Sequence, residues 1–213
     1  MIRFNRSHQI LAVGISMLAG FVDAIGFVET AGFFVSFMTG NSTRLAVGAA
    51  QGHQTALIAG GIIALFVTGV ITGSLLAARA RSARTVAVLS LVVILLAAAT
   101  RLRLDGAGWP AVACLALAMG LVNSALEGRD GAVVGVTYMT GTLVQMGHKI
   151  ANALRGGEDR QWLPHLALWA GLVAGAIIGA RLVLWSAPAG YGVATALAAV
   201  LMLRAFVIMR TDA

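Results

Sequence analysis

Residues 55–78 read TALIAGGIIALFVTGVITGSLLAA, a stretch without a charged side chain. A helix needs roughly 17 to 25 predominantly apolar residues to cross the hydrocarbon core of a bilayer. Five further apolar stretches are about this long, at residues 10–28, 85–100, 110–126, 163–184 and 188–208. The sequence therefore predicts an all-α polytopic membrane protein with about six transmembrane helices.

The composition of the chain supports this class. Its 213 residues are 59% hydrophobic and 11% charged, and the mean hydropathy is +0.90. Soluble domains carry about 25% charged residues, so this chain has too few charges to cover a surface that faces water. The expected surrounding is the lipid bilayer.

Basic residues outnumber acidic ones, fifteen to eight, but they stand singly or in pairs between the apolar stretches. A nucleic-acid interface needs basic residues clustered on one face, so no nucleic-acid partner is expected. The only cysteine is Cys114, which excludes a disulfide within the chain. The four histidines show no metal-ligand spacing, and we expect neither a metal nor another cofactor. No catalytic motif is present, and the chain is not expected to be an enzyme.

Two other apolar segments are not clean spans, residues 30–50 and 131–154. The charge-free part of the first, between Glu29 and Arg44, is too short to cross as a helix, and His148 and Lys149 interrupt the second. Because both segments carry glycine and polar residues at their centres, they predict broken or re-entrant segments.

The chain contains an internal repeat at a distance of about 100 residues. Residues 20–24 (GFVDA) correspond to residues 120–124 (GLVNS), and residues 35–41 (VSFMTGN) correspond to residues 136–142 (VTYMTGT). A third block aligns Gly69, Gly73 and Arg79 with Gly171, Gly175 and Arg181. We therefore divide the single membrane domain into two repeats, residues 1–104 and 105–213, a construction typical of small transport folds.

The distribution of positive charge favours an inverted relation between the repeats. Six crossings with the N-terminus inside place eleven basic residues inside and three outside, whereas eight crossings give nine and five. Cytoplasmic loops carry an excess of Lys and Arg. Six crossings, three in each repeat, are favoured, with a cytoplasmic N-terminus.

The two Thr-Gly motifs are the strongest candidates for a binding site. Each follows a β-branched or aromatic run and precedes a helical stretch, the pattern of a half-helix that begins inside the membrane. The free N–H groups and the dipole of such a helix start favour an anionic or carbonyl oxygen. The predicted substrate-binding residues are Thr39, Gly40, Asn41, Ser42, Arg44, Asn123, Thr140, Gly141 and Thr142. The alternative is that each motif only caps a kinked helix.

Asp23 is the candidate for proton or cation coupling. A carboxylate inside an apolar span is costly and typically faces the bundle interior. The second repeat has the neutral Asn123 at this position, so the two copies would supply a single ionisable group. The alternative is a solvated Asp23 near the interface. Arg44 could pair with Asp23 or bind an anionic solute, and its counterpart is Gln145.

Four charged residues lie at the edges of the broken segments. These residues, which could form gates or be solvated loop charges, are Glu29, Glu127, Arg129 and Asp130.

Glycines recur every fourth residue in the spans 55–78 and 163–184, which predicts that these two spans pack against each other.

The residues 20–26 (GFVDAIG), 34–41 (FVSFMTGN) and 135–142 (GVTYMTGT) resemble the YoaK-like family of bacterial membrane proteins over nearly the whole chain. This family has about six predicted helices and no known function. The resemblance implies a multi-pass protein of the bacterial cytoplasmic membrane and supplies no substrate.

Together these observations predict a small secondary transporter for a small polar or anionic solute, with paired half-helix starts near the bilayer midplane as its site. A passive channel with the same site, an intramembrane enzyme and a scaffold or sensor that does not transport are the alternatives. Because the core is small, a homodimer is expected.

Overall fold

The computed structural model describes residues 6–52, 54–126, 137–157 and 160–211. These residues form helices and no strand. In chain order the helices are α1 (Arg6–Glu29), α2 (Met38–Gln51), α3 (Thr55–Ala80), the short 3-10 helix η1 (Arg81–Ala83), α4 (Arg84–Leu104), α5 (Gly108–Val122), α6 (Met139–Leu154), α7 (Leu163–Trp185) and α8 (Ala187–Thr211).

The predicted spans correspond to α1, α3, α4, α5, α7 and α8. By length and hydropathy, four candidate membrane spans are present: Arg6–Glu29, Thr55–Leu104, Leu163–Trp185 and Ala187–Thr211. The 50-residue span contains both α3 and α4. The prediction of an all-α polytopic membrane protein is confirmed.

The helix α5 is shorter than the sequence predicts. Its expected span reaches residue 126, but the helix ends at Val122. Over the next three residues the N–H groups of Asn123, Ser124 and Ala125 donate to carbonyls three residues earlier, so the chain tightens into turns. The fourth predicted span is therefore a 15-residue apolar helix followed by tight turns, and the helix is not among the candidate membrane spans by length.

Both segments expected to be broken contain a helix too short to cross a bilayer. The helices α2 and α6 have 14 and 16 residues. At 1.5 Å per residue they reach about 21 and 24 Å, less than the hydrocarbon thickness of about 30 Å. The break before α2 is described in full, whereas residues 127–136 before α6 lie outside the described residues.

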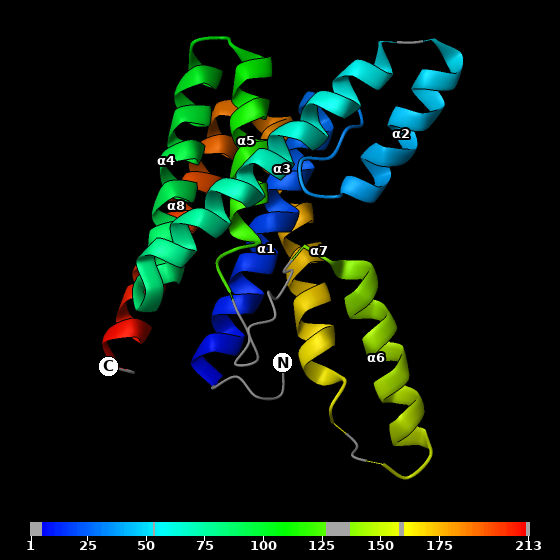
Figure 1. Cartoon of the computed structure of the whole chain (residues 1–213), viewed down its shortest axis with the longest axis vertical. Coiled ribbons are helices and arrows are strands. Elements are labelled where there is room, and N and C mark those ends of the chain that lie inside the picture. The colour runs from blue at the N-terminus through cyan, green and yellow to red at the C-terminus, as the bar shows by residue number, and fades with distance from the viewer. Residues whose placement is uncertain (1–5, 53, 127–136, 158–159, 212–213) are drawn as a thin grey trace.

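The two halves of the chain run in opposite directions through the molecule. In Figure 1 the colour shows α1, α2 and α4 running toward the upper end and α3 toward the lower end. In the second half α5, α6 and α8 run toward the lower end and α7 toward the upper end. We call the lower end, which holds the start of α1 and the α3–α4 turn, the N-terminal face. The upper end, which holds the α4–α5 turn, is the Glu29 face.

Glycines allow a close backbone approach in two helix pairs, α1 with α7 and α3 with α5. A Cβ atom on Gly175 would overlap the backbone carbonyl of Met17, and one on Gly20 would overlap that of Leu172. In the other pair, a Cβ on Gly69 would overlap the carbonyl of Leu117. These backbones touch because no side chain stands between them.

The expectation that the two glycine-rich spans pack against each other is wrong. Within the described residues α3 does not contact α7, and each of the two packs on the first helix of the opposite half. Small residues fix how closely a helix can be approached, but they do not select its partner. The glycine stripes therefore join the two halves of the chain through two crossed pairs.

Burial in α1 is repeated in and just after α5, 100 residues later. Leu11, Ile15, Leu18, Phe21 and Ile25 are buried, and so are the residues 100 positions further along the chain. The correspondence includes the residues that anchor the two breaks, because Asp23 and Asn123 each come two residues after a buried residue of the matching pair Phe21 and Leu121. The two halves thus use their first helices in the same way.

The third block of the repeat is displaced by one helical turn from the sequence alignment. Gly73 lies on Leu121 of α5, and Gly179 lies on the corresponding Phe21 of α1. The counterparts in space are therefore Gly69 with Gly175 and Gly73 with Gly179. Before these glycines, α6 is two residues longer than α2, and more residues separate α6 from α7 than separate α2 from α3, so the register of α7 is shifted relative to that of α3.

Candidate substrate site at the broken helices

The carboxylate of Asp23 holds the break between α1 and α2. Its Oδ1 atom accepts hydrogen bonds from the backbone N–H groups of Val35 and Ser36, each at 2.8 Å. Val35 and Ser36 are both buried. Backbone N–H groups inside a membrane protein need a partner, and here a charged side chain of the preceding helix supplies it.

Asn41 holds the same break from the other side. The residue is fully buried, its Nδ2 donates to the carbonyl of Phe34 at 2.6 Å, and its Oδ1 accepts from the N–H of Phe34 at 3.1 Å. The side-chain amide therefore pairs with the loop as a second peptide group would. Because both ends of the Asn41 amide are used, its place here is that of an anchor for Phe34.

Thr30 and two residues with positive φ turn the chain at the end of α1. The Thr30 hydroxyl donates to the carbonyl of Gly26 at 2.6 Å and accepts from the N–H of Phe33 at 3.0 Å. Ala31 and Gly32 have φ angles of 54° and 122°. The guanidinium of Arg44 covers Gly32 and lies 5.1 Å from the centre of the Phe33 ring. Arg44 is thus placed against the turn by a cation–π contact.

The second break has a neutral anchor at the position of Asp23. The Oδ1 of Asn123 accepts a hydrogen bond from the hydroxyl of Thr137 at 2.9 Å, and its Nδ2 donates to the carbonyl of Met119 at 2.9 Å. Thr137 corresponds to Ser36 in the repeat. The two anchors occupy equivalent places, but only the first carries an ionisable group.

The glycine of each Thr-Gly motif accommodates an aromatic ring. A Cβ on Gly40 would meet the Phe37 ring at 2.7 Å, and one on Gly141 would overlap the Tyr138 ring. Phe37 and Tyr138 are the N-cap residues of α2 and α6, and neither makes a side-chain cap hydrogen bond. The ring of Phe37 or Tyr138 therefore lies against the first turn of each short helix. The side chain at the N-cap position accepts no hydrogen bond from the free N–H groups of that turn.

Two cavities lie on either side of Phe34. One, of about 530 Å³, lies between α1 and α7 and is lined by Gly20, Asp23, Phe27, Phe34 and Ile177 among others. The other, of about 510 Å³, follows α2. Its lining includes Phe34, Thr39, Gly40, Thr43 and Arg44. Phe34, whose backbone bonds to Asn41, borders both cavities. The first contains the candidate coupling residue Asp23, and the second, the groove along α2, contains candidate solute-binding residues.

The remaining predicted residues lie at the outer faces of the short helices. Ser42 and Thr142 donate their hydroxyls to the carbonyls of Met38 and Tyr138, at 2.8 and 3.2 Å, and Thr140 is exposed. In the described residues α2 packs on α3, α6 packs on α7, and the two short helices do not touch. Thr39, Gly40 and Arg44 therefore share one groove, whereas Thr140, Gly141 and Thr142 lie apart from it.

The sequence does not reveal the ion-pair partner of Glu29, one of the candidate gate residues. Glu29 pairs with Arg103 of α4, which is far away in the sequence and has no distinguishing motif around it. The other candidate gate residues, Glu127, Arg129 and Asp130, lie outside the described residues. Within the part of the chain that the structure describes, no group of three His, Cys, Asp or Glu side chains could hold a metal ion.

Similarity to known proteins agrees with this architecture. Residues 11–207 match the model of a family described as "Protein of unknown function (DUF1275)". The chain is 38% identical over 174 residues to the UPF0700 transmembrane protein RA0705 of Rhizobium meliloti (strain 1021), which covers 81% of this chain and 75% of that relative. No solved structure matches. The family resemblance expected from the sequence is confirmed.

Proposed function

The chain belongs to the DUF1275 family of membrane proteins, and we propose that it is a small secondary transporter for a small polar or anionic solute. The observation that carries the proposal is the break between α1 and α2, where a carboxylate holds two backbone N–H groups beside a cavity. Discontinuous helices of this kind form the substrate and ion sites of many transporter folds.

An inverted repeat is the first element of the proposal. The opposite chain directions of the two halves and the matching pairs α1–α7 and α3–α5 support it. With the short helices returning to the face from which they start, each half crosses three times. The excess of basic residues then lies with both termini, which favours a cytoplasmic N-terminal face in a bacterial inner membrane.

The packing divides the helices into two bodies that could rock against each other. We call α1, α6, α7 and α8 the first body, and α2, α3, α4 and α5 the second body. Within each body a glycine-lined pair forms the centre, and the bodies meet mainly where α4 packs on α8. Rocking of one such bundle against the other around a fixed site is the usual mode of alternating access.

Asp23 would couple an ion to this movement. The carboxylate belongs to the first body, whereas Val35 and Ser36 lead into α2 of the second body. A proton or cation that binds Asp23 removes negative charge from the acceptor and weakens both hydrogen bonds. Loading of Asp23 would thereby release the start of α2, while the neutral Asn123 keeps its bond to Thr137.

The groove along α2 would take the solute. Arg44 supplies a positive charge, Thr39 and Thr43 supply hydroxyls, and the start of α2 supplies a positive dipole end. A small solute with a carboxylate or another anionic oxygen fits this chemistry. Arg44 would exchange its contact with Phe33 for the solute, so that binding also frees the turn at Gly32.

Ligand-dependent thermal stability in detergent, screened against small organic anions, tests the proposal. A ligand that binds only the folded state raises the melting temperature. We expect a stabilising anion whose effect is lost in Arg44→Gln and retained in Arg204→Gln, the matched control on α8. Counterflow in proteoliposomes with that anion then separates a carrier from a channel, because only a carrier is stimulated by solute on the far side. A stabilising anion that acts equally on both variants would contradict the assignment.

A further inference from the structure

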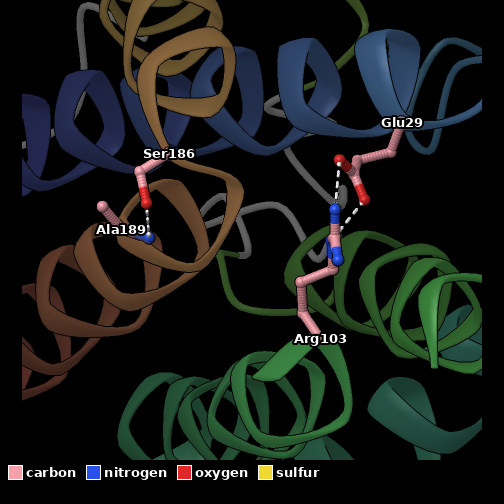
Figure 2. A network of polar contacts seen from close by, with 4 residues as sticks. All are labelled: Glu29, Arg103, Ser186 and Ala189. Carbon is pink, nitrogen blue, oxygen red and sulfur yellow. Dashed lines mark hydrogen bonds and ion pairs between the residues drawn. The ribbon is translucent and has the colours of Figure 1, made fainter. Parts of the chain in front are cut away.

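An ion pair at the Glu29 face joins two helices that otherwise do not pack. The Nε of Arg103 lies 2.7 Å from Oε2 of Glu29, and its second guanidinium nitrogen donates to Oε1 at 3.4 Å. The Nε contact is an ion pair without the alignment of a good hydrogen bond. The two side chains are 29% and 14% exposed. Figure 2 shows Arg103 reaching from α4 toward the end of α1.

The pair connects the two bodies. Glu29 ends α1 of the first body, and Arg103 lies in the last turn of α4 of the second body. In the described residues α1 and α4 make no direct helix contact, so this side-chain bridge is what links them. A second cross-body contact lies deeper, where the hydroxyls of Thr100 and Thr195 are 3.0 Å apart.

The acidic member of this pair is not repeated in the second half of the chain. The offset of 100 residues that relates α1 to α5 places the basic Arg129 at the position of Glu29. At the N-terminal face Ala205 lines a cavity of about 420 Å³, together with His8, Ser82 and Arg210 among others. The Glu29 face is bridged by opposite charges, and at the N-terminal face a cavity lies between residues of α1, α4 and α8.

A buried hydroxyl lies beneath the bridge. Tyr191 is 1% exposed, and its hydroxyl has no hydrogen-bond partner among the described residues. The charges of Glu29 and Arg103 both act on it. An unsatisfied buried hydroxyl destabilises the packing around it, so the closed Glu29 face needs a compensating attraction.

We propose that Glu29 and Arg103 form a latch that closes the Glu29 face. This inference rests on the proposed transporter function and specifies its regulation. Breaking the latch separates the end of α1 from the end of α4 and gives water access to the layer beneath it. Thr195 reports this access, because it lies one helical turn deeper than Tyr191 on α8.

The test is the rate of alkylation of Thr195→Cys in a Cys114→Ser background, measured in nanodiscs with a charged methanethiosulfonate reagent. We expect Glu29→Gln to raise the rate at least tenfold and the double variant Glu29→Arg/Arg103→Glu to restore the slow rate. Tyr191→Phe removes the unsatisfied hydroxyl and is expected to slow the reaction further.

The control is Asp105→Asn, which breaks the exposed ion pair of Arg101 and Asp105 on the same face. That pair lies within one helix turn and bridges no bodies, so the rate should not change. An unchanged rate in Glu29→Gln, an equal increase in Asp105→Asn, or a charge swap as reactive as Glu29→Gln would each overturn the latch. Because alkylation needs no solute, a failed counterflow assay together with these rates would reject transport and keep the latch.

Discussion

The two breaks differ in the charge of the side chain that anchors them. At the first break, Asp23 accepts two backbone N–H groups from the segment that leads into α2. At the second, among the described residues, Asn123 accepts the side-chain hydroxyl of Thr137. The comparison shows how a repeat can keep its geometry in both copies while only one copy can respond to a proton or a cation.

The anchors around the breaks also differ in burial. Asn41 is fully buried and bonded at both ends of its amide, whereas among the described residues the hydroxyl of its counterpart Thr142 bonds to Tyr138 at the start of α6. The helix α2 has two buried residues, and α6 has none. Among the described residues the first break has the more buried anchors, and substitutions of these anchors should have the larger effects.

Removal of the Asp23 anchor should have the largest effect. Asp23→Ala leaves two buried N–H groups without an acceptor, at a cost of about 1–3 kcal/mol each, or roughly 2–6 kcal/mol in the free energy of unfolding. Asn123→Ala removes the bond to the Thr137 hydroxyl and the bond to the Met119 carbonyl one helical turn earlier, and should cost about 1–2 kcal/mol. Unfolding in mixed micelles measures both, and equal losses would break the comparison.

Asn41→Ala should come next. It leaves the N–H and carbonyl groups of Phe34 unpaired beside a buried side chain, at roughly 2–4 kcal/mol. Thr142→Ala, its counterpart, should change the stability by less than about 0.5 kcal/mol because, in the described residues, its hydroxyl bonds to the carbonyl one turn earlier. The same unfolding assay distinguishes them, and a larger loss in Thr142→Ala would be inconsistent with the structure.

Gly175→Ala tests the packing that both halves share. The added methyl overlaps the Met17 carbonyl, and overpacking of this kind costs about 1–3 kcal/mol. A Cβ at Gly192 of α8 would meet nothing within 4 Å, so Gly192→Ala should be neutral or slightly stabilising. Melting temperatures in detergent give the difference, and similar values for the two variants would refute the close approach of α1 and α7.

The smallest effect is expected for Arg44→Gln, which introduces the residue type of the counterpart in the second repeat, Gln145. The loss is the cation–π contact with Phe33, about 0.5–1 kcal/mol at a partly exposed site. Its stability should therefore be nearly that of the wild type. A loss above about 2 kcal/mol would mean that Arg44 holds the fold and cannot be free to bind a solute.

Much of the architecture can be predicted from the sequence because hydropathy and length decide which segments cross a membrane. The apolar run 55–78 becomes α3, and the short charge-free segment after Glu29 becomes a break followed by α2. The repeated Thr-Gly motifs correctly mark both helix starts, at Met38 and Met139.

Helix partners and distant ion pairs could not be predicted in the same way. The glycine stripes of α3 and α7 show that each backbone is approached closely, but the approaching helices are α5 and α1. Arg103 looks like a solvated residue at a helix end, and only the packing brings it to Glu29. The glycine of each Thr-Gly motif makes room for the ring of Phe37 or Tyr138, a reason that spacing alone does not reveal.

Amide hydrogen exchange at the two breaks tests most directly the claim that Asp23 holds the first break and that its loss of charge releases it. Mass spectrometry of wild type and Asp23→Asn in nanodiscs compares exchange at residues 33–37 with exchange at residues 137–141. The account predicts at least tenfold faster exchange at the first break and no change at the second, because a neutral amide is a weaker acceptor for Val35 and Ser36. Unchanged exchange at residues 33–37, or equal acceleration at both breaks, would contradict it.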